Sequence, residues 1–330
     1  MDLLEKLLKT PSVSGSEAEN TNVVEEYFKS ININSYKDAS GNVTGVKKGS
    51  GKKKIILDAH FDTIGLMVTK IIDGGFVKFT TVGGVDTRIL PSMEVVIHGK
   101  NDVFGVIGTK PPHLLTDKTD APYKISDLHI DTSCSKEELE KIIEIGDTIT
   151  FSNEITKLKN NLVCAAGLDD KAGVYAILKV MENLKTTADV YAAASISEEI
   201  GMKGAKMLSA KEKFDLAIVV DVTFGKTPDI NNNGIAEVGK GPVICFGTVL
   251  SREYNEKIIE LAEKNNIPYQ TEVEPDNPGT NAWIYNASGY SVPTVMLSIP
   301  ERYMHTSGEV VSLDDINNLV KLLKLFLEAE

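Results

Sequence analysis

The sequence predicts an α/β protein, in which a mixed, mostly parallel sheet is flanked by helices and a small β-barrel domain is inserted. Uninterrupted apolar runs alternate with helical patterns, which is typical of strands buried on both faces of a parallel sheet. Between about residues 65 and 146 the pattern changes, and paired glycines separate short β-type runs. We therefore expect residues 1–64 and 161–330 to form one α/β domain and residues 65–160 to form an inserted β-rich domain.

The composition is that of an ordinary globular protein. The 330 residues are 42% apolar, which is enough for a sizeable core, and 47 acidic against 35 basic residues give a net charge of −12. This charge argues against nucleic acid and anionic membranes as partners. We expect no signal peptide, since residues 1–6 are charged, and no apolar run approaches the ~18 residues of a membrane span.

Three cysteines, Cys134, Cys164 and Cys245, are an odd number without CxxC spacing. This usage favours the reducing cytoplasm, and each cysteine is most simply a small buried apolar residue.

The N-terminal elements are predicted from helical spacing and from breakers. Leucines at positions 3–8 indicate a short helix that Pro11 ends. The segment 14–17 resembles a capping loop for a second helix that extends to about Lys29, and residues 52–58 form a strand.

The inserted region contains one helix candidate, residues 135–144, in which Glu138 can complete a capping box. Beyond residue 161 the helices and strands of the α/β domain resume. Helices are expected at 170–184, around 205–208, at 255–265 and at 312–330, and strands at 190–196 and 216–221.

Acidic residues and histidines follow five of the apolar runs. In open α/β sheets the ligand site lies beyond the carboxyl ends of the strands, so we expect these side chains to meet at one edge. Two histidines with several carboxylates form the ligand set of a dinuclear metal site. The five segments are residues 55–62, 165–170, 192–199, 216–221 and 299–305.

His60 and Asp62 lie two residues apart at a strand end, so their side chains point in similar directions. The acid can then hydrogen-bond the far nitrogen of the ring and fix its tautomer. Taken alone, a histidine beside an aspartate is more often structural.

Asp169 and Asp170 follow a small-residue turn and open a helix. An N-terminal cap is the ordinary interpretation of such a pair. In the functional interpretation Asp169 bridges two metal ions, about 3.5–4 Å apart in such sites, and Asp170 supports it.

Glu198 and Glu199 follow a strand end and precede glycines, so we expect them to have separate roles. Neighbouring charges push the pKa values of paired carboxylates apart. We assign Glu198 as the general base and Glu199 as a metal ligand, and a charged turn is the alternative. Asp221 is costly to bury unless it is paired or metal-bound. His305 precedes the last helix, whereas His98, His113 and His129 lie in the insert and are interpreted as structural or solvated.

These motifs together resemble the tetrahedral and glutamyl aminopeptidases of metallopeptidase family 42, some of which are labelled cellulase M or endoglucanase. The similarity spans nearly the whole chain and follows the order of the family's motifs. The matching segments are residues 9–15, 59–68, 105–113, 167–171, 197–205, 221–223 and 298–305.

The resemblance implies a zinc-peptidase-like fold with two divalent ions per subunit, zinc or cobalt. It implies Glu198 as the catalytic carboxylate, and Asp62 as the residue that orients His60. It also implies an insert that makes dimer contacts, and a homo-oligomer that is a dimer or a tetrahedral dodecamer. The implied ligands are His60, Asp169 and Asp221 for one metal, and Asp169, Glu199 and His305 for the other.

One position departs from the family pattern. Asn281 stands in Gly279-Thr280-Asn281-Ala282, where the family usually has Gly-Thr-Asp-Ala. The missing negative charge affects the expected substrate preference more than the metal chemistry, because every ligand position is filled.

We therefore expect a cytoplasmic metallo-aminopeptidase that removes N-terminal residues from short peptides. Related amide deacylases and carboxypeptidases are alternatives, but they need a basic clamp, and Arg88, Arg252 and Arg302 are few and scattered. An endoglucanase needs two carboxyl groups and no metal, which leaves His60 and His305 without a role. A non-enzymatic peptide binder is the last alternative.

Overall fold

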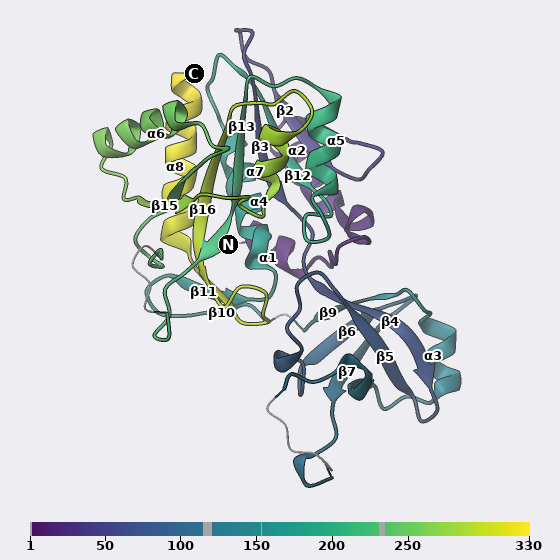
Figure 1. The fold of residues 1–330 in the computed structure, drawn as a ribbon. Helices are drawn as coiled ribbons and strands as arrows, with labels where there is room; N and C mark the ends of the chain where they lie inside the picture. Colours follow the sequence, from purple (N-terminus) through teal and green to yellow (C-terminus); the bar gives the residue numbers. More distant parts are fainter. Residues whose placement is uncertain (1, 115–120, 153, 231–234) are drawn as a thin grey trace.

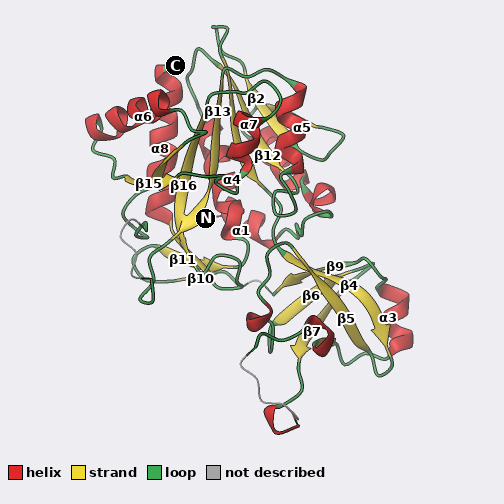
Figure 2. Cartoon of the chain, in the orientation of Figure 1, coloured by secondary structure: helices red, strands yellow, loops and turns green. Residues whose placement is uncertain are grey.

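The computed structural model describes residues 2–114, 121–152, 154–230 and 235–330. Figure 1 shows a large α/β lobe, and beside it a smaller lobe that contains β4 to β9 and α3. The helices, drawn in red in Figure 2, lie mainly around the sheet of the large lobe. They are α1 (Asp2–Lys9), α2 (Asn22–Ser30), α3 (Lys136–Ile142), α4 (Leu168–Met181), α5 (Lys203–Lys211), α6 (Arg252–Lys264), α7 (Asn281–Ala287) and α8 (Leu313–Ala329).

An eleven-stranded mixed sheet forms the large lobe, in the order β1-β2-β12-β3-β13-β16-β17-β11-β10, with β14 paired to β15 and β16. Its central strands β12, β3, β13 and β16 are parallel and buried on both faces, as their apolar runs predict. The strands are β1 (Asn34–Lys37), β2 (Val43–Lys47), β3 (Lys54–His60), β10 (Thr156–Lys157), β11 (Leu162–Ala165), β12 (Asp189–Ser195), β13 (Leu216–Phe224), β14 (Val243–Gly247), β15 (Gln270–Glu274), β16 (Thr294–Arg302) and β17 (Glu309–Ser312).

The smaller lobe is a closed barrel with the strand order β4-β5-β8-β7-β6-β9. All of its pairings are antiparallel, so the predicted fold class is confirmed. The next strand in the chain, β10, pairs with β11 and so belongs to the large sheet. The domain boundaries at residues 65 and 160 stay a prediction. The barrel strands are β4 (Gly65–Ile72), β5 (Phe76–Val82), β6 (Glu94–His98), β7 (Asp102–Gly108), β8 (His129–Asp131) and β9 (Thr148–Phe151).

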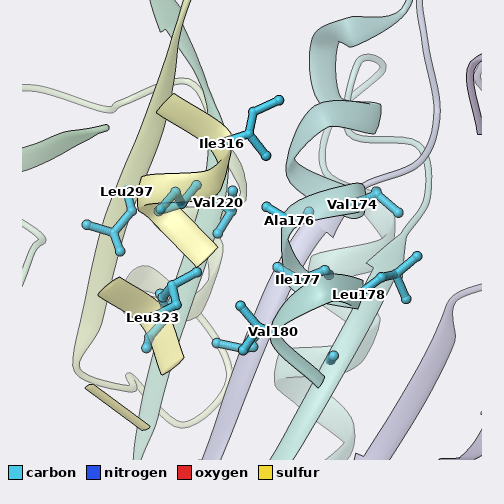
Figure 3. Packing of buried hydrophobic residues seen from close by; sticks show 14 of the residues in the cluster. Val174, Ala176, Ile177, Leu178, Val180, Val220, Leu297, Ile316 and Leu323 are labelled. Carbon is cyan, nitrogen blue, oxygen red and sulfur yellow. The ribbon is translucent and has the colours of Figure 1, made fainter. Parts of the chain in front are cut away.

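The main core lies between the sheet, α4 and α8. Figure 3 shows Val174, Ile177 and Val180 of α4 in the same apolar cluster as Leu323 of α8 and Val220 of β13. Each fully buried aliphatic side chain of this kind stabilises the fold by about 1.5–3 kcal/mol. The cluster thereby packs α4 against the central strands.

Side-chain caps mark the starts of α3 and α8, whereas the predicted start of the second helix needs a correction. Ser135 and Glu138 form the predicted capping box of α3, and Ser312 accepts hydrogen bonds from the amides of Asp314 and Asp315 at the start of α8. The second helix was expected to follow residues 14–17 directly. Instead, a 3₁₀ turn from Glu17 to Asn20 precedes α2, and the Glu17 side chain is buried. The expected strand 52–58 is shifted and ends at His60.

Cys245 is buried as predicted, whereas Cys134 and Cys164 are half-buried. All three thiols are free. Among the helices that the structure describes, none has the length and apolar character that crossing a bilayer requires.

Candidate metal centre

Five strand ends meet at one edge of the large sheet. The strands β12, β3, β13 and β16 run parallel, and β17 is antiparallel to both β16 and β11. The strand β11 therefore runs in the same direction as the central strands. Each of the five strands contains or directly precedes one of the predicted acid- or histidine-bearing segments. The topology thus brings the predicted segments together.

The predicted side chains form two groups that share one carboxylate. His60, Asp169 and Asp221 make the first group, in which the potential ligand atoms lie within 4.8 Å of one another. Asp169, Glu199 and His305 make the second group by the same distance. The Nε2 of His60 lies 3.1 Å from Asp169 Oδ1, and the Nε2 of His305 lies 3.2 Å from Asp169 Oδ2. Asp169 therefore presents one oxygen to each histidine, as a bridging ligand would.

Both histidine rings expose the correct nitrogen to these oxygens. His60 Nδ1 lies 2.9 Å from the Asp62 carbonyl oxygen, and His305 Nδ1 lies 3.2 Å from the carbonyl oxygen of Gly84. A carbonyl oxygen only accepts, so each Nδ1 must bear the proton and donate it, and in a neutral ring Nε2 has a lone pair. Those lone pairs face carboxylate oxygens, an arrangement that either a second ring proton or a divalent cation stabilises.

The buried Asp169 Oδ1 supports this interpretation. Although His60 Nε2 is 3.1 Å away, the geometry does not make a hydrogen bond to that oxygen. A buried anionic oxygen without a hydrogen bond is costly. A cation between the two atoms would remove that cost, so the residues present fit a metal ion.

The raised pKa values of the site residues show that the cluster favours bound protons, because its carboxylates outnumber its histidines. Burial opposes protonation of His60, but Asp169, Asp221 and Glu198 raise its pKa well above the ordinary value. Hydrogen bonds to Asp169 and Glu199 raise the pKa of His305 to about 11. Burial raises the pKa of Asp221 to about 7 and that of Glu198 to about 9. Divalent cations here would take the place of these protons.

Asp62 contacts two parts of the site. Its carbonyl oxygen, rather than its carboxylate, holds His60 Nδ1, because Oδ1 is 3.7 Å from that nitrogen. Its carboxylate instead accepts hydrogen bonds from the backbone amides of Glu198, at 2.9 Å, and Glu199, at 3.2 Å. Asp62 therefore connects the end of β3 to the turn that contains both glutamates.

Asp170 contacts both the end of β3 and the first turn of α4, so its contacts fit a cap as well as a supporting residue. Its carboxylate accepts hydrogen bonds from the amides of His60, at 3.3 Å, and Gly173, at 3.0 Å. A Cβ at Gly173 would lie 2.3 Å from Asp170 Oδ1, so only glycine fits there. The Asp169–Asp170 peptide bond is cis.

Glu309 is a supporting residue that the sequence analysis missed. It is buried at the start of β17, and its Oε2 accepts hydrogen bonds from the amides of Leu168, at 2.7 Å, and Asp169, at 3.3 Å. Its Oε1 accepts from the amide of His305, at 3.1 Å. Glu309 therefore fixes two predicted ligands. An acid directly before the apolar pair Val310-Val311 was the signal that could have identified it.

Asn281 lies beside the site but in neither ligand group. It is 1% exposed at the start of α7, and its side-chain nitrogen Nδ2 donates a hydrogen bond to Ser195 Oγ at 2.9 Å. Ser195 is the register partner of His60 on β12. Asn281 therefore contacts the strand end beneath the ligands.

A cavity of about 320 Å³ extends from the ligand groups to the barrel. Asp169 and Glu199 line one part of it, and the barrel residues His98 and Phe104 line another. The cavity gives a small peptide space beside the candidate metal site. His98 bonds Asp102 and Thr150 within the barrel, which agrees with its predicted structural role.

Known aminopeptidases resemble this chain in sequence and in fold. The lysyl aminopeptidase of Pyrococcus furiosus is 34% identical over 334 residues, covering 99% of this chain and 96% of that protein. The solved aminopeptidase APDkam598 from Desulfurococcus kamchatkensis has a TM-score of 0.93 and 35% identity, covering 100% of this chain and 94% of the other.

The Pyrococcus horikoshii TET1 peptidase, described as assembling into a tetrahedron or a large octahedral shell, has a TM-score of 0.85 and 32% identity, with coverage of 99% and 98%. Residues 41–322 match the family described as M42 glutamyl aminopeptidase. The chain therefore belongs to the M42 glutamyl aminopeptidase family, whose members are hydrolases that act on peptide bonds.

Proposed function

We propose that this protein is an aminopeptidase that uses two divalent metal ions, zinc or cobalt, to remove N-terminal residues from short peptides. His60, Asp169 and Asp221 would hold one ion. Asp169, Glu199 and His305 would hold the second. The observation that supports this most directly is the placement of the two Asp169 oxygens, each facing the Nε2 of a different histidine. Nitrogen and oxygen ligands in this mixture suit zinc, and cobalt fits the same set.

Glu198 is the proposed general base. It belongs to neither ligand group, although the charges of His60 and Asp221 act on it. Its neighbour Glu199 lies 3.1 Å from His305 Nε2, so the adjacent acids have different surroundings. Bound divalent ions would lower the pKa of water and polarise the peptide carbonyl. Glu198 would accept a proton from the attacking water and donate it to the leaving amine.

Substitution of the proposed base tests the mechanism. Glu198→Gln should retain both metal ions and lose about 10²–10⁴-fold in kcat, the range for a general acid or base. Metal analysis and aminoacyl-chromophore hydrolysis on the same sample measure both quantities. Glu137→Gln, an exposed change on α3, is the control and should behave as the unchanged protein. A fully active Glu198→Gln would refute the assignment.

The substrate class is tested with peptides that have free or acetylated N-termini. We expect hydrolysis of the free peptides only. The residues that line the cavity do not include Arg88, Arg252 or Arg302, so none of these three arginines supplies the clamp of a carboxypeptidase there. Cleavage of acetylated peptides would favour a deacylase. Cellulose cleavage that survives a chelator would favour the endoglucanase.

We further propose that the chain forms homo-oligomers through the barrel. Phe104 and Val106 of β7 are 71% and 43% exposed, and the related TET1 peptidase is described as a shell. Light scattering should show a dimer or larger assembly that Phe104→Asp weakens. A monomer at micromolar concentration would contradict the proposal. The three free cysteines support a reducing compartment, which we propose is the cytoplasm.

A further inference from the structure

The turn that contains Glu198 and Glu199 is anchored from two directions. From one side, the Asp62 carboxylate accepts hydrogen bonds from the backbone amides of Glu198 and Glu199. Ser197, the residue before the two glutamates, has a φ of 54°. Residues other than glycine rarely adopt this left-handed backbone conformation, which therefore needs support from its surroundings. The position of the Glu198 side chain therefore depends on contacts made by its neighbours.

The N-terminal loop of residues 12–17 provides that support. Ser14 Oγ donates to Asp62 Oδ2 at 2.5 Å, and Ser197 Oγ donates to Glu17 Oε1 at 2.8 Å. Ser14, Glu17 and Ser197 are all at most 2% exposed. Two hydrogen bonds from one loop thus reach both anchors of the glutamate turn.

The loop itself is fixed to the segment after His60. The Ser14 amide donates to the Thr63 carbonyl at 3.1 Å, and the Thr63 amide donates to the Ser12 carbonyl at 2.9 Å. The loop, the end of β3 and the glutamate turn therefore form one hydrogen-bonded unit, although they are up to 180 residues apart in the sequence.

We propose that Glu17 and Ser14 are positioning residues that hold Glu198 where it can accept a proton. Glu17 acts through Ser197, and Ser14 acts through Asp62. The inference rests on the proposed role of Glu198 as the general base. A metal ligand is drawn into place by its ion, whereas a free base relies on the surrounding protein for its position. Since displacing a reacting group by about 1 Å costs up to ~10²-fold in rate, this support affects kcat.

Replacing Glu17 separates positioning from folding. Glu17→Ala leaves the Ser197 hydroxyl buried without its acceptor, and we expect kcat to fall about 10–100-fold. KM and the content of both metals should stay within about twofold, because Glu17 belongs to neither ligand group. Glu17→Gln retains the acceptor oxygen, so kcat should recover to within about threefold of the unchanged protein.

Two matched controls define the background. Ser16→Ala changes the same loop, but the Ser16 hydroxyl that it removes donates to the Val13 carbonyl and bonds Thr148 rather than the glutamate turn, so kcat should not change. Asp315→Asn alters a buried acid of α8 that accepts from the amides of Gly239 and Gly241 instead of from the glutamate turn. It should lower Tm without lowering kcat. If Glu17→Ala does not fold, Ser197→Ala breaks the same hydrogen bond and should give the same loss of kcat.

The outcomes distinguish this inference from the function on which it rests. A Glu17→Ala enzyme with unchanged kcat, beside an inactive Glu198→Gln, would overturn the positioning role alone. Loss of metal together with activity, or an equal loss in Asp315→Asn, would also overturn it, because either result indicates a general structural effect. An active Glu198→Gln would instead reject the proposed mechanism.

Discussion

The two ligand groups differ in how the fold holds them. His60 and Asp221 lie on the central strands β3 and β13 and are 2% and 5% exposed. Glu199 and His305 lie on loops beyond β12 and β16, and the His305 side chain is 31% exposed. The first group is therefore part of the core, whereas the second depends on loops.

The second group also depends on the connection to the barrel. His305 Nδ1 contacts the carbonyl oxygen of Gly84, which follows the barrel strand β5. His60 is instead oriented by Asp62, two residues away on the same segment. A ligand that is oriented by a neighbouring residue in the chain keeps its position when other parts of the protein move. We therefore expect the ion of the first group to exchange more slowly than that of the second.

We expect the largest effect from a substitution that affects both ligand groups at once. Asp169 is the only residue that both share, so Asp169→Asn should weaken both ions at once. Because metals supply several kcal/mol of transition-state stabilisation, activity should fall by more than about 10³-fold. Metal analysis after dialysis should find less than one ion per subunit. Two retained ions would contradict the shared role.

Replacing each histidine should separate the groups. His60→Ala and His305→Ala should each bind one ion instead of two. Only His60→Ala removes a buried ring from the core, and we expect it to cost about 2–3 kcal/mol of stability. Thermal unfolding with a chelator measures that cost without the contribution of bound metal. Equal Tm values for the two variants would show that the groups are held alike.

The pH dependence follows from the raised pKa values. Burial raises the pKa of Asp221 to about 7 and that of Glu198 to about 9, so these two groups bind more protons in the metal-free fold than in the unfolded chain. Their contribution to stability therefore falls as pH rises, from about 4 to 7 for Asp221 and from about 4.5 to 9 for Glu198.

Metal binding depends on pH in the opposite direction, and the two histidines contribute to this dependence. Their raised pKa values mean that a cation must displace protons, so metal affinity should fall as pH falls. Added zinc should then raise Tm more at pH 8 than at pH 5.5. Calorimetry in buffers of different ionisation enthalpy measures the protons released on binding. A pH-independent Tm increase would contradict the proton–metal competition.

The sequence predicted the central strands well, although β3 and β13 end two and three residues later than expected, because buried parallel strands leave a direct pattern of apolar residues. Once the ends were located, topology alone was enough to bring His60, Asp169 and Asp221 together. The two glutamates were separated into roles by chemical argument, and those roles stay proposals.

Contacts through the backbone could not be predicted in this way. Asp62 holds His60 with its carbonyl oxygen and uses its carboxylate for the amides of Glu198 and Glu199. Glu309 reaches Asp169 across 140 residues of sequence. Every residue type except proline has a backbone N–H, so these partners leave no pattern of side chains. The inward Glu17 was likewise hidden, because an acid near a helix start is ordinarily a cap.

The smallest predicted effect tests the link between the barrel and His305. A Cβ at Gly84 would lie 2.9 Å from His305 Nδ1, closer than such atoms approach, so Gly84→Ala should displace the ring. We expect about tenfold weaker binding of the second ion, at the low end for loss of a partner behind a ligand. Binding of the first ion should not change.

Gly308→Ala is the matched control. Its Cβ would be 4.0 Å from Cys164 Sγ, an ordinary contact, in the same loop as His305. Titration with a competing metal indicator resolves the two affinities for each variant. If Gly84→Ala weakens both ions equally, the barrel connection affects the whole centre rather than the loop-held group. His305 of the second group contacts Gly84, which follows the barrel strand β5. If Gly84→Ala weakens only the second ion, the affinity for that ion depends on the position of the barrel.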